Sequence, residues 1–189
     1  KVSPWPISDP FHLVKRVRVN CLSDGIGISL LEKFDPKEFE NFVTSKSCIR
    51  DTSSLGSMKD SYPLTLFGFE SFIGSKNYRQ SHFLICPLYL FLEGLRNSRL
   101  KKKIRRLYFQ TAFLFFNYYL HSIGFIKSIA TRMLLIRMLN TILGICYCID
   151  NYDFNLSHLG THPVECYFGC LRILCHYNHT LFNIIHSIG

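Results

Sequence analysis

The densest group of potential metal ligands lies near the C-terminal end of the sequence. Soft ligands occur there in the pattern C-x3-C-x4-C-H-x2-H: Cys166, Cys170, Cys175, His176 and His179. Zinc accepts cysteine and histidine ligands, and the first two cysteines are spaced as two ligands on one helix face would be. The spacing matches no standard C-x2-C…H-x3–5-H arrangement, however. The pattern therefore does not favour a structural zinc site, and most cysteines are expected to be buried thiols.

A single carboxylate, Asp9, precedes a basic amphipathic stretch near the start of the sequence, SDPFHLVKRVRV. Aspartate at a helix N-cap followed by proline at the first helical position is an ordinary start signal. That signal explains the Asp-Pro pair, but it does not explain the cations that follow, Lys15, Arg16 and Arg18. The basic residues point to an anionic partner.

A second carboxylate, Glu165, lies in the stretch THPVECYFGCLR. Pro163 is expected to open a final helix, which puts Glu165 in the first helical turn. Phe168 and Arg172 follow at i+3 and i+7, on the same face of that helix. A first-turn acid is favoured by the helix dipole, so Glu165 taken alone needs no catalytic role.

Taken together, the two stretches resemble a known family. The pattern Asp-x-x-His-Leu-x-Lys-x-x-Arg, from Asp9 to Arg18, resembles the segment around the second catalytic aspartate of P-element-type (THAP-associated) DNA transposases. The pattern Glu-x-x-Phe-Gly-x-x-Arg, from Glu165 to Arg172, is similar to the segment that carries the family's catalytic glutamate. In that family the two segments flank a large, mostly helical insertion within an RNase H-like core. The order and separation of the two motifs in this sequence are of that kind.

The resemblance implies metal-dependent phosphoryl transfer on DNA. Strand cleavage and transfer use two divalent metals about 3.5–4 Å apart, and Mg²⁺ or Mn²⁺ prefers carboxylate oxygens. By this resemblance Asp9 and Glu165 are the metal ligands. Sequence-independent contacts to the DNA backbone are expected from Lys15, Arg16, Arg18 and Arg172.

The sequence also departs from the family's pattern. We expect it to start too late for the strand pair that bears the first catalytic aspartate, and the asparagine expected after Arg18 is displaced to Asn20. The resemblance therefore implies an incomplete DDE-type domain, inactive alone, that holds its metal weakly. Its partners would be DNA and either a second copy or the missing portion of a longer transposase. The alternative is a non-enzymatic, basic helical protein that binds nucleic acid or acts as a scaffold.

Composition and charge favour an intracellular protein with a polyanionic partner. Of the 189 residues 48% are hydrophobic, and the formal net charge is +9. The charge fits nucleic acid or an anionic membrane surface. The first residues of this sequence do not have the pattern of a secretory n-region and h-region, so we expect the eight cysteines to be in a reducing compartment, nuclear or cytoplasmic. The run LKKKIRRL at residues 100–107 is either a solvated helix start or a DNA-backbone patch that includes Lys101, Lys102 and Lys103.

Residues 107–126 carry no formal charge and are long enough to cross a membrane. The basic run before them resembles the flank of a membrane span. Against this, Gln110, Asn117 and His121 form a polar stripe, and cations recur in the next helix. A helix of the protein core is therefore the favoured interpretation.

The elements that must position these residues are mostly helical. Apolar spacing predicts helices at 10–22, 32–43, 81–97, 100–123, 125–149 and 164–177, an extended segment or edge strand within 1–8, and a loop at 50–61. We expect a mainly α fold, and the resemblance implies a truncated RNase H-like α/β core element interrupted by a helical insertion. The predicted division is 1–23 (core strand and basic helix), 24–160 (insertion) and 161–189 (core helix with Glu165).

Overall fold

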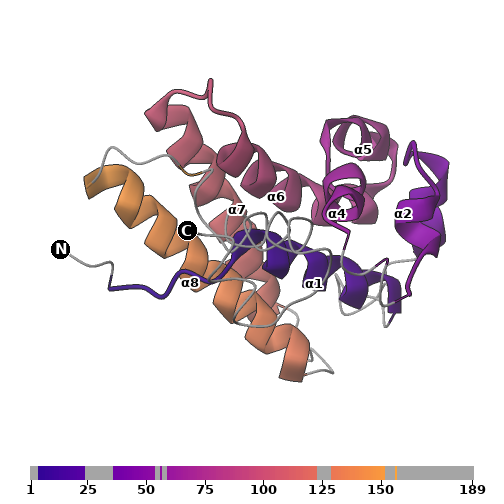
Figure 1. The fold of residues 1–189 in the computed structure, drawn as a ribbon, viewed down its shortest axis with the longest axis horizontal. Helices are drawn as coiled ribbons and strands as arrows, with labels where there is room; N and C mark the ends of the chain where they lie inside the picture. The colour runs from indigo at the N-terminus through magenta and orange to yellow at the C-terminus, as the bar shows by residue number, and fades with distance from the viewer. Residues whose placement is uncertain are drawn as a thin grey trace, which may run out of the picture.

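The computed structural model describes residues 4–23, 36–53, 56, 59–122, 129–151 and 156. These residues form helices and turns, and no strand occurs among them (Figure 1). The elements are α1 (Pro10–Ser23), η1 (Pro36–Asn41), α2 (Ser47–Arg50), α4 (Ser61–Leu66), α5 (Phe69–Gly74), η2 (Ser75–Asn77), α6 (Arg79–Arg96), α7 (Lys102–Ser122) and α8 (Ile129–Asn151). The prediction of a mainly α-helical protein is confirmed.

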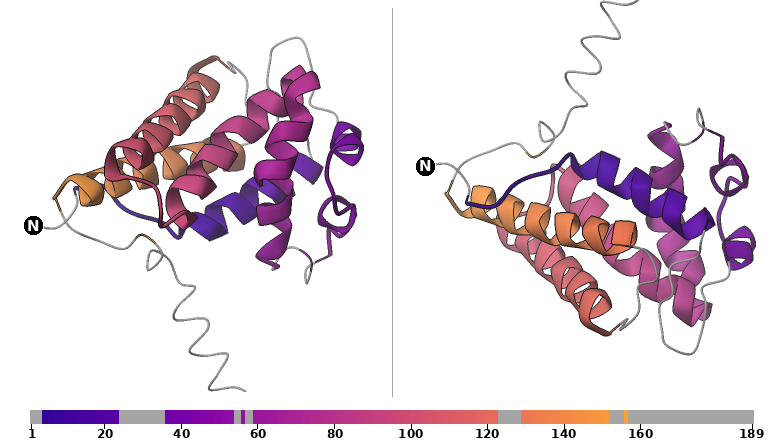
Figure 2. Two further views of the ribbon diagram at one scale, coloured as in Figure 1. Left: turned by 90° about the horizontal axis from the view of Figure 1, so that it is seen from above. Right: turned by 90° about the horizontal axis from the view of Figure 1, so that it is seen from below.

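The long helices α6, α7 and α8 pack in the order in which they occur in the chain, with α7 against both neighbours (Figure 2). Apolar residues at helical spacing bury one face of each helix. On α7 the buried face consists of Phe109, Ala112, Phe116 and Tyr119. The sequence predicts these helices to within a few residues at each end, because their periodic stretches are long.

Helix α1 packs against α8 and α4 and contributes Leu13, Val14, Val17 and Cys21 to the same hydrophobic core as the long helices. The first helix therefore shares its core with helices assigned to the predicted insertion. The second predicted boundary, near residue 160, lies outside the described residues, so the division into core and insertion stays a prediction.

The segment before α1 lies along α8 and is irregular, so the edge strand expected there is wrong for residues 4–8. The backbone N–H of Ser8 donates to Thr141 Oγ1 at 3.1 Å, a side chain of a helix rather than the backbone of a second strand. Gly144 allows the close approach, because a Cβ there would lie 2.5 Å from Ile7 Cγ1 and 3.2 Å from the carbonyl oxygen of Trp5. This segment of prolines and apolar residues therefore packs against α8 and does not form a strand.

Helices α6 and α7 form a hairpin joined by residues 97–101. Asn97 follows α6 in an extended conformation, and its Nδ2 donates to Glu93 Oε1 at 2.6 Å. Near this end of α6 the ring of Phe109 packs against Gly94, where a Cβ would lie 3.0–3.3 Å from three ring carbons. The missing side chain therefore sets how closely the two helices approach each other.

A proline inside α6 is compensated from α7. Pro87 has no N–H, so the carbonyl of Phe83, four residues earlier, loses its usual helical donor. The hydroxyl of Tyr119 on α7 donates to this carbonyl. Tyr119 is 2% exposed, and burial raises the pKa of its hydroxyl, which keeps the donor protonated. A side chain of α7 thus supplies the hydrogen bond that the proline removes from α6.

Candidate nucleic-acid interface

Asp9 acts as the N-cap of α1. Its Oδ1 accepts hydrogen bonds from the backbone N–H groups of Phe11 at 3.0 Å and His12 at 3.2 Å, and its carbonyl accepts from Leu13 N at 3.1 Å. This geometry satisfies the donors that a helix start leaves open. Glu165, the other metal ligand that the resemblance implies, lies outside the described residues. The described part of the chain holds no cluster of three or more histidine, cysteine, aspartate or glutamate side chains suited to a metal ion.

The basic residues of α1 divide into two kinds. Arg16 is exposed, whereas Lys15 pairs with Asp60 just before α4, and its side chain is only 16% exposed. Arg18 is 1% exposed, and its guanidinium donates from Nε to the carbonyl of Cys48 and from Nη2 to the carbonyl of Asp51, both at 2.7 Å. The structure therefore places Arg18 in the protein interior, where its donors bind protein carbonyls, rather than at the surface where the sequence predicts a DNA contact.

The sequence contains a signal for this burial that the prediction missed. Arg18 follows Val14 by four residues and precedes Cys21 by three, and both neighbours are fully buried. Residues at these spacings share a helix face. Arg18 therefore lies on the edge of the apolar face of α1, although its charge suggests a solvated position.

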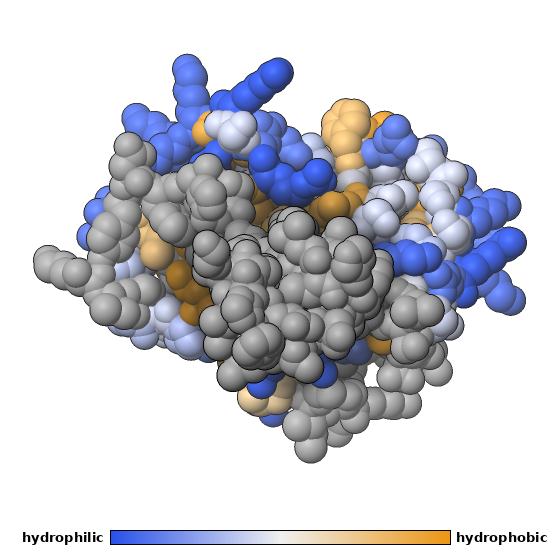
Figure 3. All heavy atoms as spheres, in the orientation of Figure 1, coloured by the Kyte–Doolittle hydropathy of each residue, from blue (hydrophilic) through white to orange (hydrophobic). Residues whose placement is uncertain are grey.

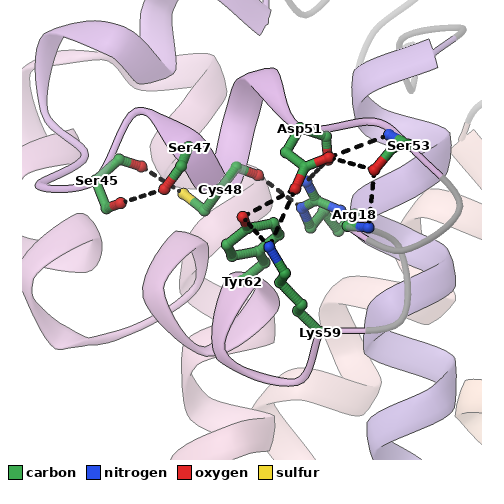
Figure 4. Close-up of polar contacts among 9 residues, drawn as sticks. Arg18, Ser45, Ser47, Cys48, Asp51, Ser53, Lys59 and Tyr62 are labelled. Atoms are coloured by element: carbon green, nitrogen blue, oxygen red, sulfur yellow. Dashed lines mark hydrogen bonds and ion pairs between the residues drawn. The ribbon is translucent and has the colours of Figure 1, made fainter.

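A polar network surrounds Arg18 and joins α1, α2 and α4 (Figure 4). The carboxylate of Asp51 accepts from Ser53 Oγ at 2.5 Å, from Tyr62 Oη at 2.9 Å and from Lys59 Nζ at 3.3 Å. These bonds, first that from Ser53 and then that from Tyr62, lower the pKa of Asp51 to about 2. Arg18 also lies over the ring of Tyr62, with its Cζ 4.9 Å from the ring centroid. The network holds the shorter helices to α1 and contains no activated nucleophile.

Burial raises the pKa of several thiols, both near this network and on α8. Burial raises the pKa of Cys48 to about 11, and its Sγ donates to the carbonyl of Ser45 at 2.9 Å. Burial also raises the pKa of Cys21 and of Cys146. A thiol must lose its proton to act as a nucleophile or a metal ligand. The candidate zinc ligands near the C-terminus, Cys166 to His179, lie outside the described residues, as does Arg172.

Exposed cations gather at the turn between α6 and α7, which we call the basic turn: Arg96, Arg99, Lys101, Lys102, Lys103 and Arg106. Hydrophilic side chains cover this edge of the molecule in the space-filling view (Figure 3). Arg105 is half-buried and donates from Nη2 to the carbonyl of Asn97 at 2.7 Å, which ties the first turn of α7 to the loop. Arg106 forms an ion pair of 3.0 Å with Asp150 on α8.

The sequence identifies only part of this surface. The run at residues 100–107, which contains Lys101 to Lys103, has two open interpretations at the level of sequence, and it includes neither Arg96 nor Arg99. The hairpin brings those two arginines to the same turn as the lysines. A short connection between two periodic stretches is the signal that could have joined them.

Membrane crossing is the rival function for this part of the chain. Within the described ranges one helical stretch, Arg132–Asn151 of α8, is long and apolar enough to span a membrane. Half of its apolar window is buried inside the structure. The described part of the uncharged stretch, residues 107–122 of α7, does not meet the same criterion.

Comparison with known proteins identifies no family for this chain. No family model matches its sequence. No curated protein and no solved structure is significantly similar to it.

Proposed function

We propose that this protein is a non-catalytic nucleic-acid-binding protein that contacts the phosphate backbone through the basic turn. Closely spaced cations bind phosphates regardless of base sequence, and they release counterions as they do so. Two acidic side chains bond to residues of the turn: Glu93 bonds to Asn97, and Asp150 pairs with Arg106. The lysines are exposed and form no ion pair with an acid among the described residues.

The observation that carries this proposal is where the lysines lie on α7. The N-terminal end of a helix has a positive partial charge, so cations there are unfavourable by about 0.3–1 kcal/mol each. The first turn of α7 contains no acid, and Lys102 and Lys103 occupy it, directly after Lys101. An arrangement that opposes local stability is typical of a binding surface rather than of a solvated helix start.

Replacing Lys101, Lys102 and Lys103 with alanine is expected to weaken binding to a DNA duplex and to flatten its salt dependence. The slope of log K against log salt should fall by about three units, one for each phosphate that the variant no longer neutralises. Fluorescence anisotropy at several salt concentrations measures this slope.

The matched control removes the same charge elsewhere. Lys46, Lys76 and Arg79 are exposed outside the basic turn, so their joint replacement with alanine should change the slope much less. Equal slopes for the two triple variants would mean that net charge, and not this turn, governs binding. Lys102→Glu with Lys103→Glu should raise the thermal midpoint while reducing DNA affinity, because acids at this position suit the helix dipole.

The motif resemblance supports a second proposal, that the chain derives from a DDE transposase with an RNase H-like core. In that case Asp9 and Glu165 hold Mg²⁺ or Mn²⁺, with Arg16 and Arg172 on the DNA backbone. The support is the order and separation of the two motifs in the sequence. The N-cap bonds of Asp9 offer a way to separate its structural role from metal binding.

Asp9→Asn is expected to leave stability almost unchanged, within about 0.5 kcal/mol, because asparagine caps helices as well as aspartate does. Asp9→Ala should cost about 1 kcal/mol, since it removes the acceptor for Phe11 N and His12 N. Under the transposase proposal, Mn²⁺ binding to the whole chain in isothermal titration should be abolished in Asp9→Asn and in Glu165→Gln. Equal Mn²⁺ binding by both variants and the wild type would refute that proposal.

A further inference from the structure

One face of α7 leaves apolar side chains in solvent. The exposed fractions are 42% for Ile104, 54% for Leu107, 66% for Leu114 and 52% for Tyr118. Spacings of three, seven and four residues put them in one row along the helix. At 1.5 Å per residue the row is about 21 Å long. We call these residues the α7 stripe; in both views of Figure 2 the helix lies at an edge of the molecule.

The polar residues beside the α7 stripe limit what can cover it. Exposed Gln110 and His121 and half-buried Asn117 follow one side of the stripe, while the cations are confined to the start of the helix. An anionic bilayer surface favours lysine and arginine along the whole polar face of an interfacial helix. Nucleic acid offers flat bases that stack on aromatic rings, whereas most of the stripe is aliphatic. A protein surface with a matching apolar row is the better fit.

We propose that the α7 stripe packs against the α7 stripe of a second copy of this chain, with the two helices antiparallel. A twofold axis near Thr111 would place Ile104 of one copy beside Tyr118 of the other, and the reverse. One surface then serves both copies, as in most homodimers. This inference does not depend on nucleic-acid binding.

Charge decides the direction of the two helices. Parallel packing would place Lys101, Lys102 and Lys103 of one copy against the same lysines of the other. With the axis near Thr111, antiparallel packing separates the two groups of lysines by about 27 Å along the helix. That separation is more than two Debye lengths at 0.1 M salt, so the repulsion is screened. Each basic start would also lie beside the negative end of the other copy's helix dipole.

The proposed contact is small. A stable interface covers about 800 Å² on each partner, which a single row of side chains does not reach. We therefore expect a reversible dimer that dissociates in the range from about 1 µM to 1 mM.

Sedimentation equilibrium of the whole chain tests the proposal without nucleic acid present. The wild type should shift from 22.0 kDa toward twice that mass as its concentration rises. Leu114→Glu should raise the dissociation constant at least about tenfold, because it puts a charge at the most exposed point of the stripe. Phe69→Glu, at a 61% exposed position on α5, is the matched control and should dimerise like the wild type. Circular dichroism confirms that both variants are folded.

Cysteine cross-linking tests the direction of the helices. A short bismaleimide should join a mixture of Ile104→Cys and Tyr118→Cys chains, and it should not join Ile104→Cys chains to one another beyond the wild-type background. Efficient joining of Ile104→Cys alone would overturn the antiparallel arrangement. A wild type that stays monomeric at the highest concentration would overturn the dimer. A monomer that binds phosphatidylserine vesicles, and does not bind them as Leu114→Glu, would assign the stripe to a membrane instead.

Discussion

Arg18→Ala is expected to lower the free energy of unfolding by about 3–6 kcal/mol, because it removes two hydrogen bonds from a charged donor, each worth about 1.5–3 kcal/mol. The carbonyls of Cys48 and Asp51 no longer receive the guanidinium N–H groups, and the packing of Arg18 over the Tyr62 ring disappears as well. The shorter helices should then detach from α1 more readily. Urea unfolding followed by circular dichroism measures the change.

Two further variants separate geometry from charge. Arg18→Lys should restore little of the stability that Arg18→Ala removes, because an ammonium group cannot reach two carbonyls as the planar guanidinium does. Arg16→Ala, at the exposed position two residues earlier, should change stability by less than about 0.5 kcal/mol. If Arg18→Ala unfolds at the wild-type urea concentration but binds DNA more weakly, Arg18 belongs with the DNA-binding residues after all.

Tyr119→Phe is expected to destabilise the protein by about 1–3 kcal/mol, the cost of leaving a buried carbonyl without a donor. The phenylalanine ring keeps the packing between α6 and α7 and removes only the hydroxyl that serves the carbonyl of Phe83. The same urea experiment detects this decrease in stability.

A double-mutant cycle with Pro87→Ala tests the cause. Alanine at this position restores a backbone N–H that can donate to the carbonyl of Phe83 within α6. Tyr119→Phe should therefore cost less in the Pro87→Ala protein than in the wild type. Equal costs in both backgrounds would show that the proline does not create the need for the hydroxyl.

The sequence predicts the helices better than it predicts which of their surfaces are free. The apolar periodicity of α6, α7 and α8 is long and regular, and their positions follow from it. The segment 4–8 has the composition of an edge strand, yet it packs against α8. The local composition of this segment does not determine whether it will pair with a strand or pack against a helix, as it does against α8 at Gly144.

In the candidate site, too, the sequence predicts some exposed residues correctly but not which charged residues are buried. The exposure of Lys101 to Lys103 can be predicted from the local sequence, because a run of cations cannot be buried without partners. The burial of Arg18 depends on carbonyls at residues 48 and 51, which lie far along the chain. The role of Asp9 as an N-cap follows from its neighbours alone, whereas a second role shared with Glu165 would require the fold to bring two ends of the chain together.

The packing of Phe109 on Gly94 has a consequence for recognition by the basic turn. It holds the two helices close together just inside the loop that carries the cations. A preorganised surface loses less conformational entropy when it meets its ligand than a loose loop does. Under the proposed function, enlarging Gly94 would therefore weaken phosphate binding without removing a single charge, because the turn would gain conformational freedom.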